Sequence, residues 1–459
     1  MNKAYSHHGN TVLKRSSTPP PHKTSSQGLR KRIHISSPVG QYEIGCIAHN
    51  LRIDKTQSNN NNNNMSSSRD TLKSLHSTVS FVPTEVETDN ESMTSTTSSW
   101  ESTEIIQPHT GTKTVLVTGG AGFIGSSVAD TLLARGDTVV IIDEINDYYD
   151  VNLKKSNLAL LKEKYGEERL KIYVGDICDT TLVNKIFAEE QIQWVCHMAA
   201  RAGVRPSIDD PYVYIHSNIE GTTRLMEISA RNGVQNFVFA SSSSVYGGSK
   251  STFFSEDEVV DNPVSPYAAS KKACELLAYT YHHLYKLNVT GLRFFTVYGP
   301  RGRPDMAPFK FIDRVSRGAT LQQFGDGSSS RDYTYIDDIV DGVVRAVDRP
   351  YPYQIFNLGK GSGTSLKEFI DLVQKHVGKP AKIQLLPDQP GDVPYTCADV
   401  SKAERLLGYR SQVPFEEGIR RTVEWYKQTY GIPEETEAAP LQQEEMPVSL
   451  PVEMPAMAK

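Results

Sequence analysis

The sequence predicts an α/β fold: a doubly wound parallel sheet with a smaller C-terminal α/β domain, flanked by disordered termini. Two observations predict the sheet. A strand-like run, a turn with evenly spaced glycines and a helix-like run open the apolar part of the chain, and strand-like and helix-like runs alternate after it. A third observation, the composition of the two ends, separates them from the part that folds.

The two ends of the 459-residue chain differ from its middle. Residues 1–111 are rich in Ser, Thr, Asn and Pro, with six consecutive Asn from Asn59 to Asn64, and residues 431–459 are rich in Pro and Glu. Such segments bury too little apolar surface to offset the entropy lost on ordering. We therefore expect disorder in both, and a folded part between them.

Overall composition argues against several classes of protein. The net charge of −5 gives no reason to expect nucleic-acid binding. No run approaches the roughly 18 apolar residues of a membrane span, and we expect no metal site. The five cysteines lack any CxxC pair, as is typical of a reducing compartment such as the cytoplasm. The alternative is organelle targeting, because residues 1–42 carry seven Lys or Arg and no acid.

The first predicted unit, VLVTGGAGFIGSSVADTLLARGDTVVIID, is typical of a Rossmann-type dinucleotide site. Glycines at three-residue spacing let the backbone approach a pyrophosphate at the N-terminus of the following helix. The next strand ends at Asp143, where a carboxylate binds ribose hydroxyls and repels a 2′-phosphate, so we expect NAD and not NADP. We assign residues 112–295 to this domain. The expected contacts with NAD in this unit are Gly119, Gly122, Phe123, Ile124, Gly125 and Asp143.

Other candidate residues lie where later strands end, because ligands bind at the carboxyl ends of parallel strands. Asp176, Ala199 and Ser242 fall at such ends. Asp176 and its neighbour Ile177 are expected to contact adenine, although Asp176 could instead cap a helix. We expect Ala199 to line the cofactor site.

The stretch SPYAASKK places a tyrosine and a lysine on one helix face. Ser265 is a suitable N-cap and Pro266 suits the first turn, so Tyr267 and Lys271, four residues apart, should point the same way. An ammonium near the phenol favours the phenolate and indicates an acid/base pair. Tyr246 and Lys250 have the same spacing, so the pattern alone does not select one pair.

Ten motifs in order, from VTGGAGFIGS to ADVSKAERLLGY, resemble the extended short-chain dehydrogenase/reductases that act on nucleotide sugars. They include HMAARAGV, ASSSSVYG, SPYAASK and RFFTVYGP, and they span about residues 112–430. The resemblance implies that Ser242, Tyr267 and Lys271 are catalytic and that Lys271 also holds the nicotinamide ribose. Tyr246 and Lys250 are then the accidental copy, because the glycines after Tyr246 would break a helix.

The resemblance also narrows the reaction. The family's 4,6-dehydratases carry an Asp-Glu pair, and its decarboxylases a Glu, where this chain has Ser243 and Ser244. Elimination therefore lacks its acid and base. Epimerisation needs only a keto sugar that rotates and takes its hydride back on the other face, and small serines leave room for that rotation.

Three stretches, including NDYYDVNLKKSNLALL and TVYGPRGRPDMAPFKFID, resemble the UDP-glucuronate 4-epimerases. The resemblance implies that Thr296 and Arg303 bind the sugar carboxylate, Arg331 the diphosphate and Asp392 the uridine ribose, with Ser243 and Ser244 beside the sugar. Residues 296–430 would then mainly bind the UDP-sugar. Surface charge is the alternative for Arg303, and a surface ion pair for Arg331.

The implied activity is interconversion of UDP-glucuronate and UDP-galacturonate by transient oxidation at C4 with bound NAD. The alternatives are a 4-epimerase for a neutral UDP-hexose and a non-catalytic NAD-sensing protein. The resemblance further implies a homodimer that pairs the helix after Asn218 with the helix of Tyr267.

Overall fold

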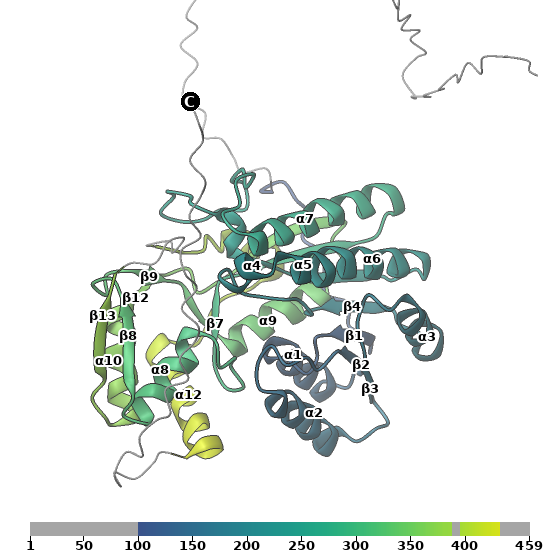
Figure 1. The fold of residues 1–459 in the computed structure, drawn as a ribbon. Helices are drawn as coiled ribbons and strands as arrows, with labels where there is room; N and C mark the ends of the chain where they lie inside the picture. The colour runs from purple at the N-terminus through teal and green to yellow at the C-terminus, as the bar shows by residue number, and fades with distance from the viewer. Residues whose placement is uncertain (1–99, 388–394, 432–459) are drawn as a thin grey trace, which may run out of the picture. The chain divides into compact units, whose positions relative to one another are not determined.

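A seven-stranded parallel sheet forms the centre of the fold (Figure 1). Its order is β3 (Leu170–Val174), β2 (Thr138–Asp143), β1 (Thr114–Thr118), β4 (Trp194–His197), β5 (Asn236–Ser242), β6 (Val289–Phe294) and β11 (Tyr353–Leu358). The direction of winding reverses between β1 and β4, which is where doubly wound sheets bind ligands. The predicted sheet is confirmed. This computed structural model describes residues 100–387 and 395–431, within one compact unit, Glu91–Lys459.

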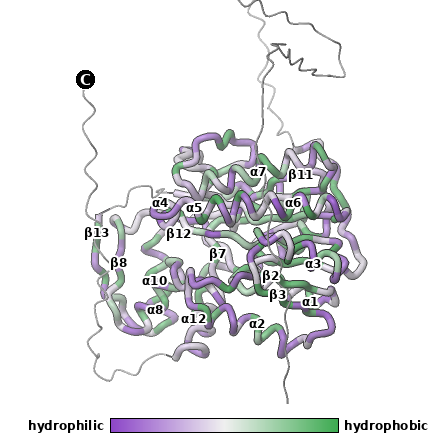
Figure 2. Tube along the Cα trace, turned by 45° about the vertical axis from the view of Figure 1, so that its right-hand side comes forward, coloured by the Kyte–Doolittle hydropathy of each residue, from purple (hydrophilic) through white to green (hydrophobic). Residues whose placement is uncertain are grey.

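Helices cover both faces of the sheet. On one face, Val115 and Val117 of β1 share a core with α1 (Phe123–Ala134), α2 (Val151–Tyr165) and α9 (Ile336–Val347). On the other, Leu116 shares a core with α3 (Thr180–Glu190), α6 (Gly221–Arg231) and α7 (Pro266–Tyr285). Burial on both faces explains why the strands read as continuous apolar runs. Figure 2 shows hydrophobic and hydrophilic residues interspersed along α6 and α7, as helices with one buried side require.

A smaller set of elements follows β6. Short two-stranded pairings join β7 (Thr296–Tyr298) to β10 (Tyr333–Tyr335), β9 (Ser330–Arg331) to β12 (Thr364–Ser365), and β8 (Thr320–Phe324) to β13 (Lys382–Leu386). The helices of this part are α8 (Ala307–Ser316), α10 (Leu366–Val377), α11 (Ser401–Leu407) and α12 (Phe415–Tyr430). Figure 1 shows β8, β13 and α10 together, apart from α1–α3.

Two elements beyond residue 295, a strand of the central sheet and a helix that covers it, pack with the first segment. β11 pairs with β6 along its whole length, and α9 packs against α1. The division of the chain into an NAD-binding part, residues 112–295, and a mainly UDP-sugar-binding part, residues 296–430, stays a prediction. Structurally, hydrogen bonds join the two segments across that boundary.

Contacts with the sheet region begin before residue 112, the predicted end of the disordered N-terminal segment. The His109 N–H donates to the carbonyl of Asp348 (2.8 Å), and its ring lies 5.2 Å from that of Trp194. The Ile106 N–H donates to the Tyr351 hydroxyl (3.2 Å). The disorder predicted for residues 1–99 and 432–459 lies outside the described residues. Within residues 100–387 and 395–431, no helix is both long and apolar enough to cross a membrane.

Candidate active site

A cavity of about 520 Å³ runs along the carboxyl ends of the central strands and reaches β7 and β9. This volume lies in the range of small-molecule and cofactor sites. Of the predicted site residues, those that line it are Gly119, Gly122, Phe123, Ile124, Gly125, Asp143, Asp176, Ile177, Ala199, Ser242, Ser243, Ser244, Tyr267, Lys271, Thr296, Arg303 and Arg331. Asp392 lies outside the described residues. The tertiary structure therefore brings together predicted site residues that lie up to about 210 positions apart in the sequence, from Gly119 to Arg331.

The glycine turn after β1 has no room for side chains at two positions. Gly119 has φ +68°, and a Cβ there would lie 2.7 Å from the backbone nitrogen of Ala199. A Cβ on Gly125 would lie 2.1 Å from the carbonyl oxygen of Gly119. Gly122 is the N-cap of α1 and provides no side chain to its first N–H groups, which remain available to an anion. These features fit a dinucleotide pyrophosphate.

Asp143 stands at the end of β2 with its carboxylate held in place. Its Oδ2 accepts from the Ala121 N–H (3.0 Å) and its Oδ1 from the Ile145 N–H (2.8 Å). Both donors are backbone groups, one in the glycine turn and one two residues beyond Asp143, so the protein's own backbone orients the acid. This position fits the predicted contact with a ribose.

Asp176 follows β3 and faces the same cavity. It accepts from the Cys178 N–H (2.8 Å) and pairs with Nε2 of His216 (2.7 Å), and this hydrogen bond is the main cause of a raised His216 pKa. The alternative role for Asp176, capping α3, is wrong. Asp179 is that N-cap, and it accepts from two N–H groups of the first turn.

Helix α7 begins as predicted. Pro266 occupies the first turn, and the Ser265 Oγ accepts from the Ala268 N–H (3.1 Å). Because the helix is regular from this cap onward, Tyr267 and Lys271 lie one turn apart, and both line the cavity.

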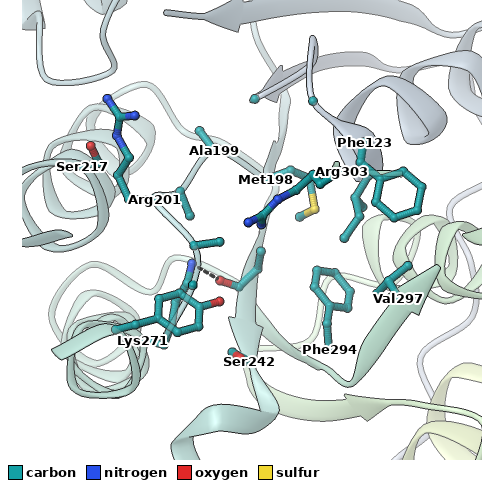
Figure 3. A pocket seen from close by; sticks show the side chains of 18 of the residues that line it. Phe123, Met198, Ala199, Arg201, Ser217, Ser242, Lys271, Phe294, Val297 and Arg303 are labelled. Carbon is teal, nitrogen blue, oxygen red and sulfur yellow. Dashed lines mark hydrogen bonds between the residues drawn. The ribbon is translucent and has the colours of Figure 1, made fainter. Parts of the chain in front are cut away.

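Lys271 is almost completely buried, with 4 % of its surface exposed. Its Nζ donates to the carbonyl of Ala240 on β5 (2.8 Å), the dashed bond in Figure 3. This bond ties α7 to the strand that ends at Ser242. The Tyr267 ring packs edge-on against Tyr214, with centroids 6.1 Å apart.

Four consecutive serines, Ser241–Ser244, span the end of β5 and the turn that follows it. Ser242 caps a short 3-10 helix, η2 (Ser243–Tyr246), and its Oγ accepts from the N–H (3.1 Å) and from the Oγ (2.9 Å) of Ser244. Ser243 and Ser244 both line the cavity. The end of β5 therefore presents the hydroxyl groups of Ser242, Ser243 and Ser244 to the cavity.

Arg303 lies between β7 and α8, and its side chain is 19 % exposed. It forms a bidentate ion pair with Asp305, and its guanidinium lies 5.3 Å from the centroid of the Tyr148 ring. Figure 3 shows Arg303 extending into the cavity from the side away from Lys271. The alternative reading of Arg303 as a solvent-exposed charge is wrong. Thr296 opens β7, and Arg331 lies in β9 on the same cavity.

Sequence reasoning missed a group of charged residues near Asp143. Glu144 and Arg201 form an ion pair (3.0 Å) on the cavity, and Lys154 donates to the carbonyl of Asn146 (2.7 Å). Nε of Arg201 is buried, with no hydrogen-bond partner in the part of the chain that the structure describes. The rule that selected Ala199, proximity to a strand end, would also have selected Arg201.

Fold and site together are those of an enzyme class that combines a dinucleotide-binding sheet with a Ser, Tyr and Lys set. The chain belongs to the extended short-chain dehydrogenase/reductase family, and residues 116–422 match the family described as GDP-mannose 4,6 dehydratase.

The chain is also similar to named enzymes and to solved structures over about two thirds of its length. The chain is 47 % identical over 314 residues to a UDP-glucuronate 4-epimerase from Thermodesulfobacterium geofontis, covering 68 % of this chain and 96 % of the relative. A UDP-glucuronic acid 4-epimerase from Bacillus cereus, solved with UDP-glucuronic acid and NAD, is 36 % identical with a TM-score of 0.65, over 69 % of this chain and all of that one (100 %). A UDP-glucose 4-epimerase from Thermotoga maritima, solved with UDP-glucose, is 33 % identical with a TM-score of 0.63, over 69 % and 99 %.

Proposed function

We propose that this chain is a UDP-glucuronate 4-epimerase, which interconverts UDP-glucuronate and UDP-galacturonate with bound NAD. The observation that carries the proposal is Arg303: a largely buried guanidinium shares one cavity with Ser242, Tyr267 and Lys271. A guanidinium at this position can pair with the carboxylate of an anionic sugar, whereas a neutral sugar has no carboxylate for it to bind. The similarity to the Thermodesulfobacterium and Bacillus enzymes supports the same substrate.

NAD would occupy the part of the cavity beside β1, β2 and β3. The glycine turn and the N-terminus of α1 would bind its pyrophosphate, Asp143 the adenosine ribose, and Asp176 with Ile177 the adenine. Ala199 would line the path to the nicotinamide, whose ribose Lys271 would hold. When bound, NAD takes the hydride from C4 of the sugar and returns it to the opposite face of that carbon.

The protein's own groups handle the proton. Tyr267 would accept the proton of the C4 hydroxyl, while Ser242 donates a hydrogen bond to the same oxygen. Lys271, buried one turn along α7, favours the tyrosinate by its charge. After the 4-keto sugar has rotated, Tyr267 would return the proton. The side chains of Ser243 and Ser244 are hydroxyl groups, and neither provides a carboxyl group to catalyse the elimination of water. The reaction would therefore end at epimerisation.

The sugar end of the cavity would recognise the C5 carboxylate. Thr296 offers one hydroxyl and Arg303 a planar fork that matches a carboxylate. Arg331 would bind the diphosphate and Asp392 the uridine ribose.

Replacing Arg303 with Ala tests this assignment. We expect kcat/KM for UDP-glucuronate to fall roughly 30-fold. This factor corresponds to a loss of about 2 kcal/mol of transition-state stabilisation, the scale of a lost charge-assisted hydrogen bond. Turnover of UDP-glucose, which has no carboxylate, should fall much less. An equal loss for both sugars would favour the neutral-hexose epimerase, and a wild type inactive on both would favour a non-catalytic NAD-binding protein.

We further propose that the protein is a homodimer through α6 and α7. These helices lie side by side (Figure 1), and apolar side chains of α7 are exposed, including Leu276 (59 %), Tyr279 (55 %) and Leu284 (61 %). A second copy would cover them. Sedimentation equilibrium should give twice the mass of one chain. The Leu276→Glu variant should have the mass of a single chain.

We also propose a cytoplasmic location. Cys178, Cys196, Cys274 and Cys397 are free thiols, as expected in a reducing compartment. A reporter fused to residues 1–42 should stay in the cytosol; its import into an organelle would contradict this.

A further inference from the structure

Arg303 is hydrogen-bonded along one edge by a residue that the proposed function does not use. Its Nε donates to Oδ1 of Asp305 (3.0 Å) and its Nη2 to Oδ2 (2.5 Å). A guanidinium has five N–H donors in a fixed fork, and this side-on pair uses two of them. Asp305 engages neither Nη1 nor the second N–H of Nη2, which together form the other edge of the fork.

Tyr148 restrains the same guanidinium in another direction. Its ring lies 5.3 Å from the guanidinium carbon, in a cation–π contact. The ring is itself fixed, because its hydroxyl donates to the carbonyl of Ala202 (2.6 Å). Asp305 and Tyr148 therefore both restrain the Arg303 guanidinium, one by two hydrogen bonds and the other by its ring.

Backbone geometry keeps Arg303 and Asp305 close. They are two residues apart, and the Met306 N–H donates to the carbonyl of Arg303 (3.2 Å). One turn earlier, the Gly302 N–H donates to the carbonyl of Gly299 (3.1 Å). The ion pair is thus a local feature of a hydrogen-bonded loop.

We propose that Asp305 is a positioning residue for substrate recognition: it holds Arg303 so that the Nη1/Nη2 edge faces the sugar carboxylate. This inference rests on the proposed function and assigns Asp305 no contact with the substrate. A fork that is already oriented loses less entropy on binding, and this advantage exists only for a sugar that bears a carboxylate. The opposite role would be competition, in which Asp305 occupies Arg303 and the substrate must displace it.

Substitution of Asp305 distinguishes these roles. For Asp305→Ala we expect a loss of at least about tenfold in kcat/KM for UDP-glucuronate, mainly through KM, because the fork is no longer oriented. Turnover of UDP-glucose, and binding of UDP alone measured by calorimetry, should change by less than about twofold. Asp305→Glu should restore part of the loss. If the Ala variant does not fold, Asp305→Asn replaces it in these measurements, because Asn keeps the side-chain shape of Asp and removes its charge.

Two results would overturn the inference. Tighter binding of UDP-glucuronate by Asp305→Asn would identify Asp305 as a competitor, and equal losses for both sugars would show a general defect. As a matched control, Asp341→Asn removes an Asp–Arg pair (Asp341 Oδ2 to Arg345 Nε, 2.7 Å) on α9, away from the residues that line the cavity, and should leave all three measurements unchanged. A wild type without preference for UDP-glucuronate would overturn the proposed function as well. A wild-type preference that Asp305→Ala leaves unaltered would overturn this inference alone.

Discussion

Two tyrosine–lysine pairs in this protein have the same spacing and opposite surroundings. Tyr267 and Lys271 lie in the first turns of α7, and both line the cavity. Tyr246 ends the 3-10 helix η2, the next residue, Gly247, has φ +56°, and Lys250 is exposed. Four-residue spacing joins two side chains only when the backbone between them is helical. The comparison teaches that the helix, and not the YxxxK pattern, makes the pair.

Tyr246 has a different function in the fold. Its buried hydroxyl donates to Oδ1 of Asn357 (2.7 Å) and accepts from Nη1 of Arg293 (3.0 Å). Burial raises its pKa, so it stays a neutral phenol. Arg293 is also bound by Glu275, whose Oε2 lies 2.8 Å from its Nη2. Glu275 stands one turn beyond Lys271 on α7, so the second tyrosine supports the helix that carries the first pair.

The largest difference between the two tyrosines should appear in turnover. Tyr267→Phe removes only the ionisable oxygen, and loss of a general acid/base group costs about 10²- to 10⁴-fold in rate. We expect kcat to fall by that factor while the thermal midpoint and the amount of bound NAD stay unchanged. If Tyr246→Phe lost as much activity per folded molecule, the assignment of the catalytic pair would be wrong.

The second prediction concerns the buried ion pair between Glu275 and Arg293, which connects Tyr246 to helix α7. Glu275→Ala leaves the Arg293 guanidinium buried and without its carboxylate, and removing one partner of such a pair costs about 3–5 kcal/mol. We expect the free energy of unfolding, measured with denaturant, to fall by this amount. Arg231→Ala, which removes an exposed pair with Glu227 on α6, is the control and should change it little. Similar losses in both variants would contradict a special role for the buried pair.

A smaller effect on stability is expected for Tyr246→Phe. The substitution leaves Asn357 and Arg293 each without one buried hydrogen bond, at a cost of about 1–3 kcal/mol. Denaturant unfolding should report this loss, and kcat should stay within about twofold of wild type. A large fall in kcat at unchanged stability would place Tyr246 in the chemistry and remove the contrast between the pairs.

The smallest effect is expected for Lys250→Ala. An exposed side chain away from the cavity contributes within about 0.5 kcal/mol to stability, and activity should not change. The same substitution at Lys271 removes a buried ammonium bonded to Ala240 and should lower kcat severely. Equal behaviour of the two lysine variants in a turnover assay would break the comparison.

Much of the fold was predictable because its signals are local. The Ser265 cap, the Pro266 first turn and the glycine turn after β1 each involve a few neighbouring residues, and backbone sterics act over that range. Continuous apolar runs indicated strands buried on both faces. The dinucleotide-binding pattern indicated Asp143, and the rule that ligands bind at strand ends indicated Asp176, Ala199 and Ser242; all four line the cavity.

By itself, then, the sequence determined the type and order of the elements, the glycine turn and the face shared by Tyr267 and Lys271. Only the tertiary structure decided which buried groups Tyr246 contacts, how Asp305 and Tyr148 contact Arg303, and how β11 joins β6 across the predicted boundary. The physical reason is range. Caps and turns depend on neighbours along the chain, whereas the direction of a guanidinium or the partner of a strand depends on groups that packing brings together from distant segments.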